Sequence, residues 1–241
     1  MELFTYVLKS AGILTLFYLV YRMVLQRDTF FTANRTYLLA GILAALTLPF
    51  VTFTTVTFIE TPVLLTTNSE VPLAPLNSIN NTTETASFDF WTLVSWAYLA
   101  GVVLMFVHFS IQLFSLLKLL FTHSAISYKG YRMIETSQTI APFSFFNYIV
   151  YNPTTHQPEE LQMILAHEKV HASQWHSLDI LLANCMRAFQ WLNPFAWFYK
   201  SSIEANLEFL ADSETVAEIS SKTEYQMALL KASSTLPVPA L

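Results

Sequence analysis

LQMILAHEKVHASQWHSLD, residues 161–179, is the stretch around which the chain is organised. It contains neither Gly nor Pro, and we predict that it forms one helix. Residues four apart share a helix face, so His167 and His171 can offer two imidazole nitrogens to one metal ion. Glu168 can reach a water molecule bound to that metal. This HExxH pattern is typical of zinc hydrolases, in which Glu is the general base, although five residues with three fixed also occur by chance.

The composition is that of a membrane protein. Of 241 residues, 54% are hydrophobic and only 12% are charged, and the mean hydropathy is +0.43. Soluble domains carry about 25% charged residues. The net charge of −5 is small and basic residues do not cluster, so we expect no nucleic-acid partner. The single cysteine, Cys185, excludes an internal disulfide and a cysteine-rich zinc site, and we interpret it as a small apolar residue.

Three long apolar runs lie before residue 122, and we predict that each forms a membrane-spanning helix. A hydrocarbon core of ~30 Å takes about 20 helical residues to cross. The predicted spans are residues 3–25, 37–58 and 91–114. Residues 59–90, rich in Thr, Asn, Ser and Pro, are predicted to form an extracytoplasmic loop. His108 in the third run is interpreted as a packed intramembrane residue, with a metal or proton-relay role as the alternative.

The positions of Lys and Arg indicate how these helices are oriented. The first connection carries Arg22, Arg27 and Arg35, whereas the loop at 59–90 contains neither Lys nor Arg. Basic residues return after the third span. Because short cytoplasmic loops are enriched in Lys and Arg, we expect the first connection and everything after the third span to lie in the cytoplasm. The HExxH stretch is then predicted at the cytoplasmic face of the membrane.

The segment before the HExxH stretch has the pattern of short strands. Residues 122–160 alternate in polarity and are rich in Tyr, Ile, Phe and Thr, which predicts two or three strands. Phe143, Phe145 and Phe146 are interpreted as core residues by default. The alternative is an edge strand beside the metal, whose backbone could pair with an extended substrate.

A catalytic zinc ion needs a third protein ligand, and residues 201–216, SSIEANLEFLADSETV, offer one. Glu208 and Asp212 are four residues apart and share a helix face. By itself this pair would be interpreted as a solvated acidic face. Beside HExxH on the same side of the membrane, we predict Glu208 as a ligand. Asp212 is predicted to accept a hydrogen bond from a ligand His and fix its tautomer.

The intervening residues 177–200, SLDILLANCMRAFQWLNPFAWFYK, decide whether Glu208 can reach the histidines. One crossing of the membrane here would place Glu208 on the wrong side. However, Arg187 would be costly near the middle of a bilayer, and Asn193-Pro194 breaks a helix. We therefore predict two helices joined at 192–194 that dip into the bilayer and return. Arg187 is interpreted as a headgroup anchor or a residue lining the cleft.

Several other polar residues close to the motif in sequence, or on the helices predicted beside it, can contribute to the site or can be structural. His176 lies five residues after His171, about 140° further round a helix, so we predict a position on the surface rather than a fourth ligand. The oxyanion-stabilising residue is open, with His176, Tyr199 and Asn206 as candidates. Asp179 is interpreted as a capping residue or as a residue that supports a ligand.

HEKVHASQWHSLDILL (167–182), with FQWLNPFAWFYKSSIEANLEFLADSETV (189–216), resembles the BlaR/MecR family of membrane zinc metallopeptidases, and especially its Bacteroidetes versions. The resemblance is specific over about residues 140–230, including Ala141-Pro142-Phe143-Ser144-Phe145, and loose over the N-terminal half. It implies that His167, His171 and Glu208 bind zinc and that Glu168 is the general base. Asp212 matches the Asp of the E-x-x-x-D pair in the similar CAAX-processing metalloproteases.

The resemblance implies a gluzincin-like zinc metalloendopeptidase of the bacterial inner membrane that cleaves a cytoplasmic or juxtamembrane protein in signal transduction. By analogy the substrate is a transcriptional repressor or the chain itself. The expected fold is mainly α, with a transmembrane region at 1–121 and a small α+β zincin-like domain at 122–241. Its expected partners are a protein or peptide substrate and the lipid bilayer, with a homodimer left open.

Two alternatives to an active peptidase remain open on the sequence. One is a signal transducer or scaffold with a structural zinc site, and the other is a chance HExxH in a membrane scaffold. Family members usually continue with another span and an extracytoplasmic or other C-terminal domain. Since this chain stops at Leu241, the resemblance leads us to expect a truncated member.

Overall fold

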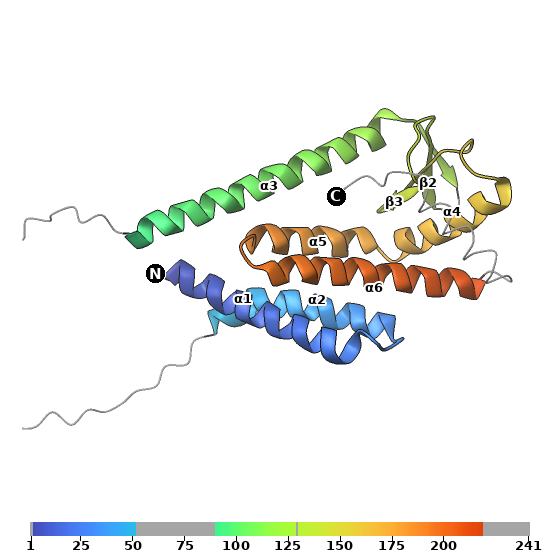
Figure 1. The fold of residues 1–241 in the computed structure, drawn as a ribbon. Coiled ribbons are helices and arrows are strands. Elements are labelled where there is room, and N and C mark those ends of the chain that lie inside the picture. The colour runs from blue at the N-terminus through green and yellow to red at the C-terminus, as the bar shows by residue number, and fades with distance from the viewer. Residues whose placement is uncertain (1, 52–89, 129, 219–241) are drawn as a thin grey trace, which may run out of the picture.

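The computed structural model describes residues 2–51, 90–128 and 130–218, and is mostly helical with a small sheet (Figure 1). Within the described residues, three helices before residue 123 are long and apolar enough to cross a membrane, by length and composition. They are α1 (Glu2–Val20, with a π-helical turn to Leu25), α2 (Phe31–Thr47, with a 3₁₀ turn to Phe50) and α3 (Phe90–Thr122). The second begins at Phe31 rather than at residue 37. Its predicted end and the loop that follows lie outside the described residues.

Three further helices follow a small sheet: α4 (Pro158–Ser173), α5 (His176–Phe189) and α6 (Pro194–Glu218). The predicted single helix over 161–179 is wrong, because Trp175 adopts a left-handed backbone with φ 59° and α5 leaves in a new direction. The predicted break before Pro194 is confirmed. Pro194 suits the first position of a helix, where its missing N–H costs no helical hydrogen bond. The Asn193 side chain accepts a hydrogen bond from the Phe195 N–H.

The α5–α6 pair lies between α1–α2 on one side and α3 on the other (Figure 1). Gly41 of α2 permits a close approach to α6, because a Cβ atom there would lie 2.1 Å from Tyr199 Oη. The regions predicted as 1–121 and 122–241 therefore share one core. Its buried apolar side chains include Leu14, Leu38, Ile42, Met186, Ile203 and Leu207.

Helix α3 contacts the rest of the protein near its two ends. Near its start, the Tyr98 hydroxyl donates a hydrogen bond to the Phe189 carbonyl at the end of α5. Near its C-terminal end, Leu116 and Leu120 pack in one cluster with residues of the sheet. The part of α3 from Ile111 to Leu119 lines a cleft, which contains the candidate site described below.

The sheet has four strands in the order β1-β2-β4-β3, where two or three were predicted. The strands are β1 (Ala125–Tyr128), β2 (Tyr131–Glu135), β3 (Phe143–Phe145) and β4 (Tyr148–Tyr151). Strands β2 and β4 are parallel, and the other pairs are antiparallel. Successive strand residues point to opposite faces. Ile134 and Val150 accordingly pack towards α3, while Met133 and Ile149 pack with Ala172 of α4. The sheet thus joins α3 to α4.

Candidate metal centre

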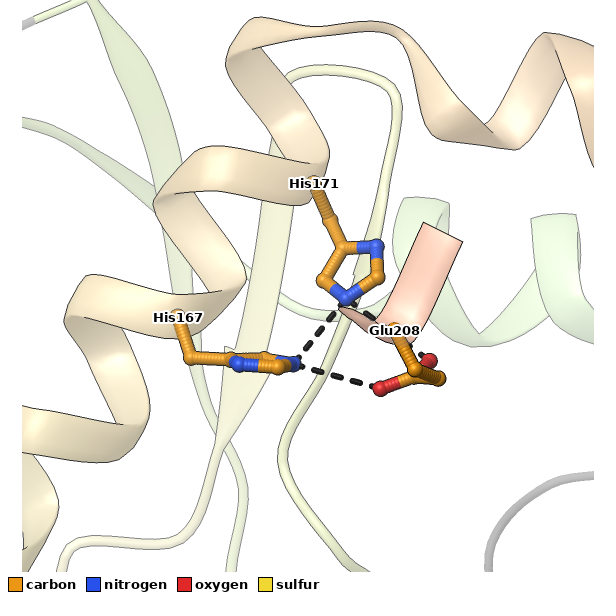
Figure 2. A group of neighbouring side chains, drawn as sticks. All are labelled: His167, His171 and Glu208. Atoms are coloured by element: carbon orange, nitrogen blue, oxygen red, sulfur yellow. Dashed lines mark hydrogen bonds and ion pairs between the residues drawn. The ribbon is translucent and has the colours of Figure 1, made fainter. Parts of the chain in front are cut away.

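Three side chains from two helices converge at one point (Figure 2). His167 and His171 project from successive turns of α4, and Glu208 comes from α6, which the break at Pro194 has returned to the same side. His167 Nε2 lies 3.0 Å from His171 Nε2 and 3.4 Å from Glu208 Oε2. His171 Nε2 lies 3.7 Å from Glu208 Oε1. One ligand atom from each residue therefore lies within 4.8 Å of the others.

This donor set fits a zinc ion. Zinc–nitrogen bonds of about 2.0–2.1 Å put two nitrogen ligands roughly 3.3 Å apart at the tetrahedral angle. The two Nε2 atoms are 3.0 Å apart, close to that separation. Two imidazoles and one carboxylate also match the three-ligand sets of catalytic zinc, which leave one position open. The arrangement can therefore hold a metal ion with a free side towards the cleft.

Glu168 lines the same cleft and is hydrogen-bonded to Ser144 of β3. Burial raises the pKa of this carboxyl to about 7, while the charge of His167 and the hydrogen bonds from Ser144 oppose the rise. A carboxyl group with such a pKa can both accept and release a proton near neutral pH. Sequence reasoning placed Ser144 only within a family-like stretch and missed its contact with Glu168.

Asp212 lies behind His167, one helical turn beyond Glu208. Its Oδ1 atom is 3.1 Å from His167 Nδ1, the nitrogen that faces away from the other two converging side chains. Burial lowers the pKa of His167, but hydrogen bonds to Asp212 and Glu208 outweigh it and raise this pKa to about 10. Burial also acts against the charge of Glu208, yet His167 and His171 bring its pKa below the usual value. Asp212 can thus hold the proton of His167 on Nδ1.

His176 lies behind His171, and the predicted surface position is wrong. Its side chain is buried, with 1% of the residue exposed, and its Nδ1 atom is 2.8 Å from His171 Nδ1. The left-handed turn at Trp175 explains the difference, since it turns α5 so that His176 faces back towards α4. Burial lowers the pKa of His171 to about 4 and that of His176 to about 3.

Arg35 and Gln174 extend this contact to α2. His176 Nε2 is 3.1 Å from Gln174 Oε1, which lies 3.3 Å from Arg35 Nη1. Arg35 also donates to the Gln174 carbonyl over 2.8 Å and forms a 2.6 Å ion pair with Asp179. Asp179 therefore pairs with an arginine of α2 rather than capping a helix. The sequence had indicated Arg35 only as a charge that orients the membrane helices.

Two of the candidates for stabilising an oxyanion face away from the cleft. The Tyr199 hydroxyl donates a hydrogen bond to the Leu38 carbonyl over 2.7 Å, and Asn206 donates to the Phe31 carbonyl over 3.0 Å. Both residues hold α6 against α2, so these two predictions are wrong.

The Arg187 guanidinium lies 4.8 Å from the centre of the Trp197 ring, a cation–π distance.

A cleft of about 980 Å³ opens in front of the three converging side chains. Its walls come from α3, from the segment that enters β3, and from α4, α5 and α6. Strand β3 is at the edge of the sheet, and Phe143 and Ser144 line the cleft, while Phe145 is buried in the core. This placement agrees with the alternative interpretation of an edge strand beside the metal site.

One known protein family matches the chain over a range that includes the helices, the sheet and the three converging side chains. A family model described as BlaR1 peptidase M56 matches residues 2–240 of the chain. A search of curated proteins finds no match.

Proposed function

The chain belongs to the BlaR1 peptidase M56 family, and from that premise we propose that it is a membrane zinc metalloendopeptidase. The observation that carries the proposal is the convergence of His167, His171 and Glu208 at a cleft that Glu168 also lines. The family supports a metallopeptidase, and the donor set supports zinc in a gluzincin-like arrangement of two His and one Glu.

In the proposed reaction, Glu168 moves the proton. Zinc, when bound, supplies Lewis-acid chemistry by lowering the pKa of water towards about 7 and polarising a carbonyl. Glu168 accepts a proton as water attacks the scissile carbonyl and later delivers it to the leaving amine. The hydrogen bond from Ser144 keeps the carboxylate facing the cleft. The edge of β3 can hold an extended peptide backbone beside these groups.

We propose that α1, α2 and α3 span the bacterial inner membrane, with the catalytic cleft at the cytoplasmic face. The apolar length of the three helices and the arginines of the first connection support this topology. The α5–α6 pair is proposed to dip into the bilayer at 190–193. The substrate is then a cytoplasmic or juxtamembrane protein, with a transcriptional repressor or the chain itself as candidates in signal transduction.

The test compares wild type with Glu168→Gln for zinc content and for cleavage of casein or of the chain itself. The variant is expected to keep its zinc and to lose about 10²- to 10⁴-fold in cleavage rate, the usual contribution of a general acid–base group. Glu159→Gln is the matched control, because Glu159 is exposed in the first turn of the same helix. Equal cleavage by wild type and Glu168→Gln would overturn the peptidase mechanism. Zinc bound without cleavage by either protein would indicate a structural metal site.

A further inference from the structure

We propose that His176 is a positioning residue for His171, and that Gln174 connects it to Arg35 of α2 in one hydrogen-bonded relay. The proposal rests on the metal site of the proposed function. Three contacts carry it: His171 Nδ1 to His176 Nδ1 at 2.8 Å, His176 Nε2 to Gln174 Oε1 at 3.1 Å, and Gln174 Oε1 to Arg35 Nη1 at 3.3 Å.

Donor and acceptor requirements give the relay one direction. A metal ion bound through His171 Nε2 leaves the ring proton on Nδ1, which must then donate. His176 Nδ1 is 2.8 Å away and accepts, so the proton of the neutral His176 ring is on Nε2. That N–H donates to Gln174 Oε1, which also accepts from the Arg35 guanidinium. The relay ends at the Arg35 guanidinium. Because an arginine side chain has hydrogen-bond donors only, it can only donate to Gln174 Oε1, as this order of donors and acceptors requires.

The backbone holds His176 in this position. His176 is almost fully buried, and a buried ring nitrogen requires a protein partner. Trp175, immediately before it, has a φ of 59°, a conformation that bulky residues rarely adopt. Such a conformation persists where the surrounding contacts determine it, and it often marks a functional site. The turn at Trp175 brings the imidazole of His176 back to His171.

The far end of the relay is anchored on a different part of the protein. Arg35 lies one turn into α2 and is held by the Asp179 carboxylate at 2.6 Å and the Gln174 carbonyl at 2.8 Å. Moving α2 relative to α4 would therefore pull directly on the groups that orient His171. The relay links the position of an apolar N-terminal helix to the geometry of one metal ligand.

The test measures zinc affinity of the full chain in nanodiscs, by competition with a chromophoric chelator, together with the absorption spectrum of the Co²⁺-loaded protein. His176→Phe keeps the ring but removes the acceptor, and is expected to weaken zinc binding about 10- to 100-fold and to change the Co²⁺ spectrum. His176→Asn places an amide oxygen near the position of Nδ1 and is expected to restore most of the affinity. His123→Phe is the control, because His123 follows the end of α3 and is not among the residues that line the cleft.

Arg35→Met is expected to weaken zinc binding by less than His176→Phe. The matched control is Arg22→Met, since Arg22 is an exposed arginine in the π-helical turn that ends α1 and bonds locally, to Gln26. Wild-type affinity in His176→Phe would overturn the relay, and equal losses in His176→Phe and His176→Asn would overturn its acceptor role. Wild-type affinity in Arg35→Met would overturn the link to α2. A wild type without zinc affinity would overturn the metal site and the relay together, whereas a zinc-binding but inactive wild type would overturn only the peptidase function.

Discussion

His167 and His171 lie one turn apart on α4, but their Nδ1 atoms are hydrogen-bonded to residues of two different helices, α6 and α5. Behind His167 is a carboxylate, Asp212, whose side chain is 37% exposed and belongs to the helix that also carries Glu208. Behind His171 is a buried imidazole, His176, whose hydrogen bonds continue towards α2. The first support is a single partly solvated carboxylate, and the second is a longer chain of contacts that begins at a buried imidazole and ends at a partly buried arginine.

This difference indicates what can disturb each half of the site. The His167 half depends on α4 and α6, which the sequence brings together through the break at Pro194. The His171 half depends in addition on where α2 lies, through Arg35. Movement of α2 would therefore act on His171 through Arg35, and on the His167 half through the packing of α6 against α2. Each of the following predictions tests whether the two halves are separate in this way.

The largest effect is expected at Glu208, because its carboxylate contacts both halves. Glu208→Gln replaces a charged ligand with a neutral amide. We expect zinc binding to weaken by more than the 10- to 100-fold typical of residues outside the ligand set, with loss of cleavage. Glu204→Gln, one turn earlier on α6, is the control, since Glu204 pairs with Lys200. Retention of full zinc affinity by Glu208→Gln would contradict the assignment of this ligand.

An intermediate effect is expected at Asp212. Asp212→Ala removes the acceptor for His167 Nδ1 and should weaken zinc binding about 10- to 100-fold, whereas Asp212→Asn keeps an acceptor oxygen and should lose less. Zinc affinities are measured by chelator competition, with Glu214→Gln of the same helix as control. Glu214 is exposed.

Double-mutant cycles with Arg35→Met test whether the supports of His167 and His171 act independently on zinc binding. The contact of Asp212 with His167 and the contacts of Arg35 involve different residues. The binding free-energy changes of Asp212→Ala and Arg35→Met should therefore add within ~0.3–0.5 kcal/mol. Those of His176→Phe and Arg35→Met should sum to more than the double mutant loses, because both act through one relay. The reverse pattern would show that the halves are not divided as described.

Much of the site could be predicted from local sequence rules. The spacing of His167 and His171 places them on one face of a helix, and Asn193-Pro194 indicates the break that returns Glu208. Both elements are present in the structure, and membership of the family is confirmed. The roles of the site residues and the membrane topology stay predictions. These local features suffice because they depend on residues close together in the chain.

The errors have equally physical causes. The turn at Trp175 involves neither Gly nor Pro, so a continuous helix was expected and His176 was placed about 140° from its neighbour His171. The contact of Arg35 with Asp179 joins residues 144 positions apart, which no local pattern reveals. The sequence alone was enough to exclude Asn206 as an oxyanion-stabilising residue. Asn206 is two residues before Glu208, and residues two apart lie on roughly opposite sides of a helix.

The smallest effect, and the one that separates the halves most directly, is the pH dependence of stability in chelator-treated, metal-free protein. An unfolded His has a pKa near 6.5. The folded pKa of His167 is raised to about 10 by Asp212 and Glu208 against the effect of burial, so its contribution to stability is complete below about pH 6.5 and is lost as pH rises towards 10. The folded pKa of His176 is lowered to about 3 by burial, so its contribution is present above about pH 6.5 and is lost as pH falls.

Variants should therefore differ from wild type at opposite ends of the pH scale. The difference in unfolding midpoint between wild type and Asp212→Asn should shrink as pH rises from 6 to 9, because wild type loses the His167–Asp212 contribution. The difference between wild type and His176→Asn should shrink as pH falls from 7 to 5, because the unfolded wild-type chain then binds a proton at this histidine that the buried imidazole does not bind. Thermal unfolding followed by tryptophan fluorescence measures both. Parallel pH curves for the two variants would mean that His167 and His176 share one electrostatic environment, in contradiction to the two supports described.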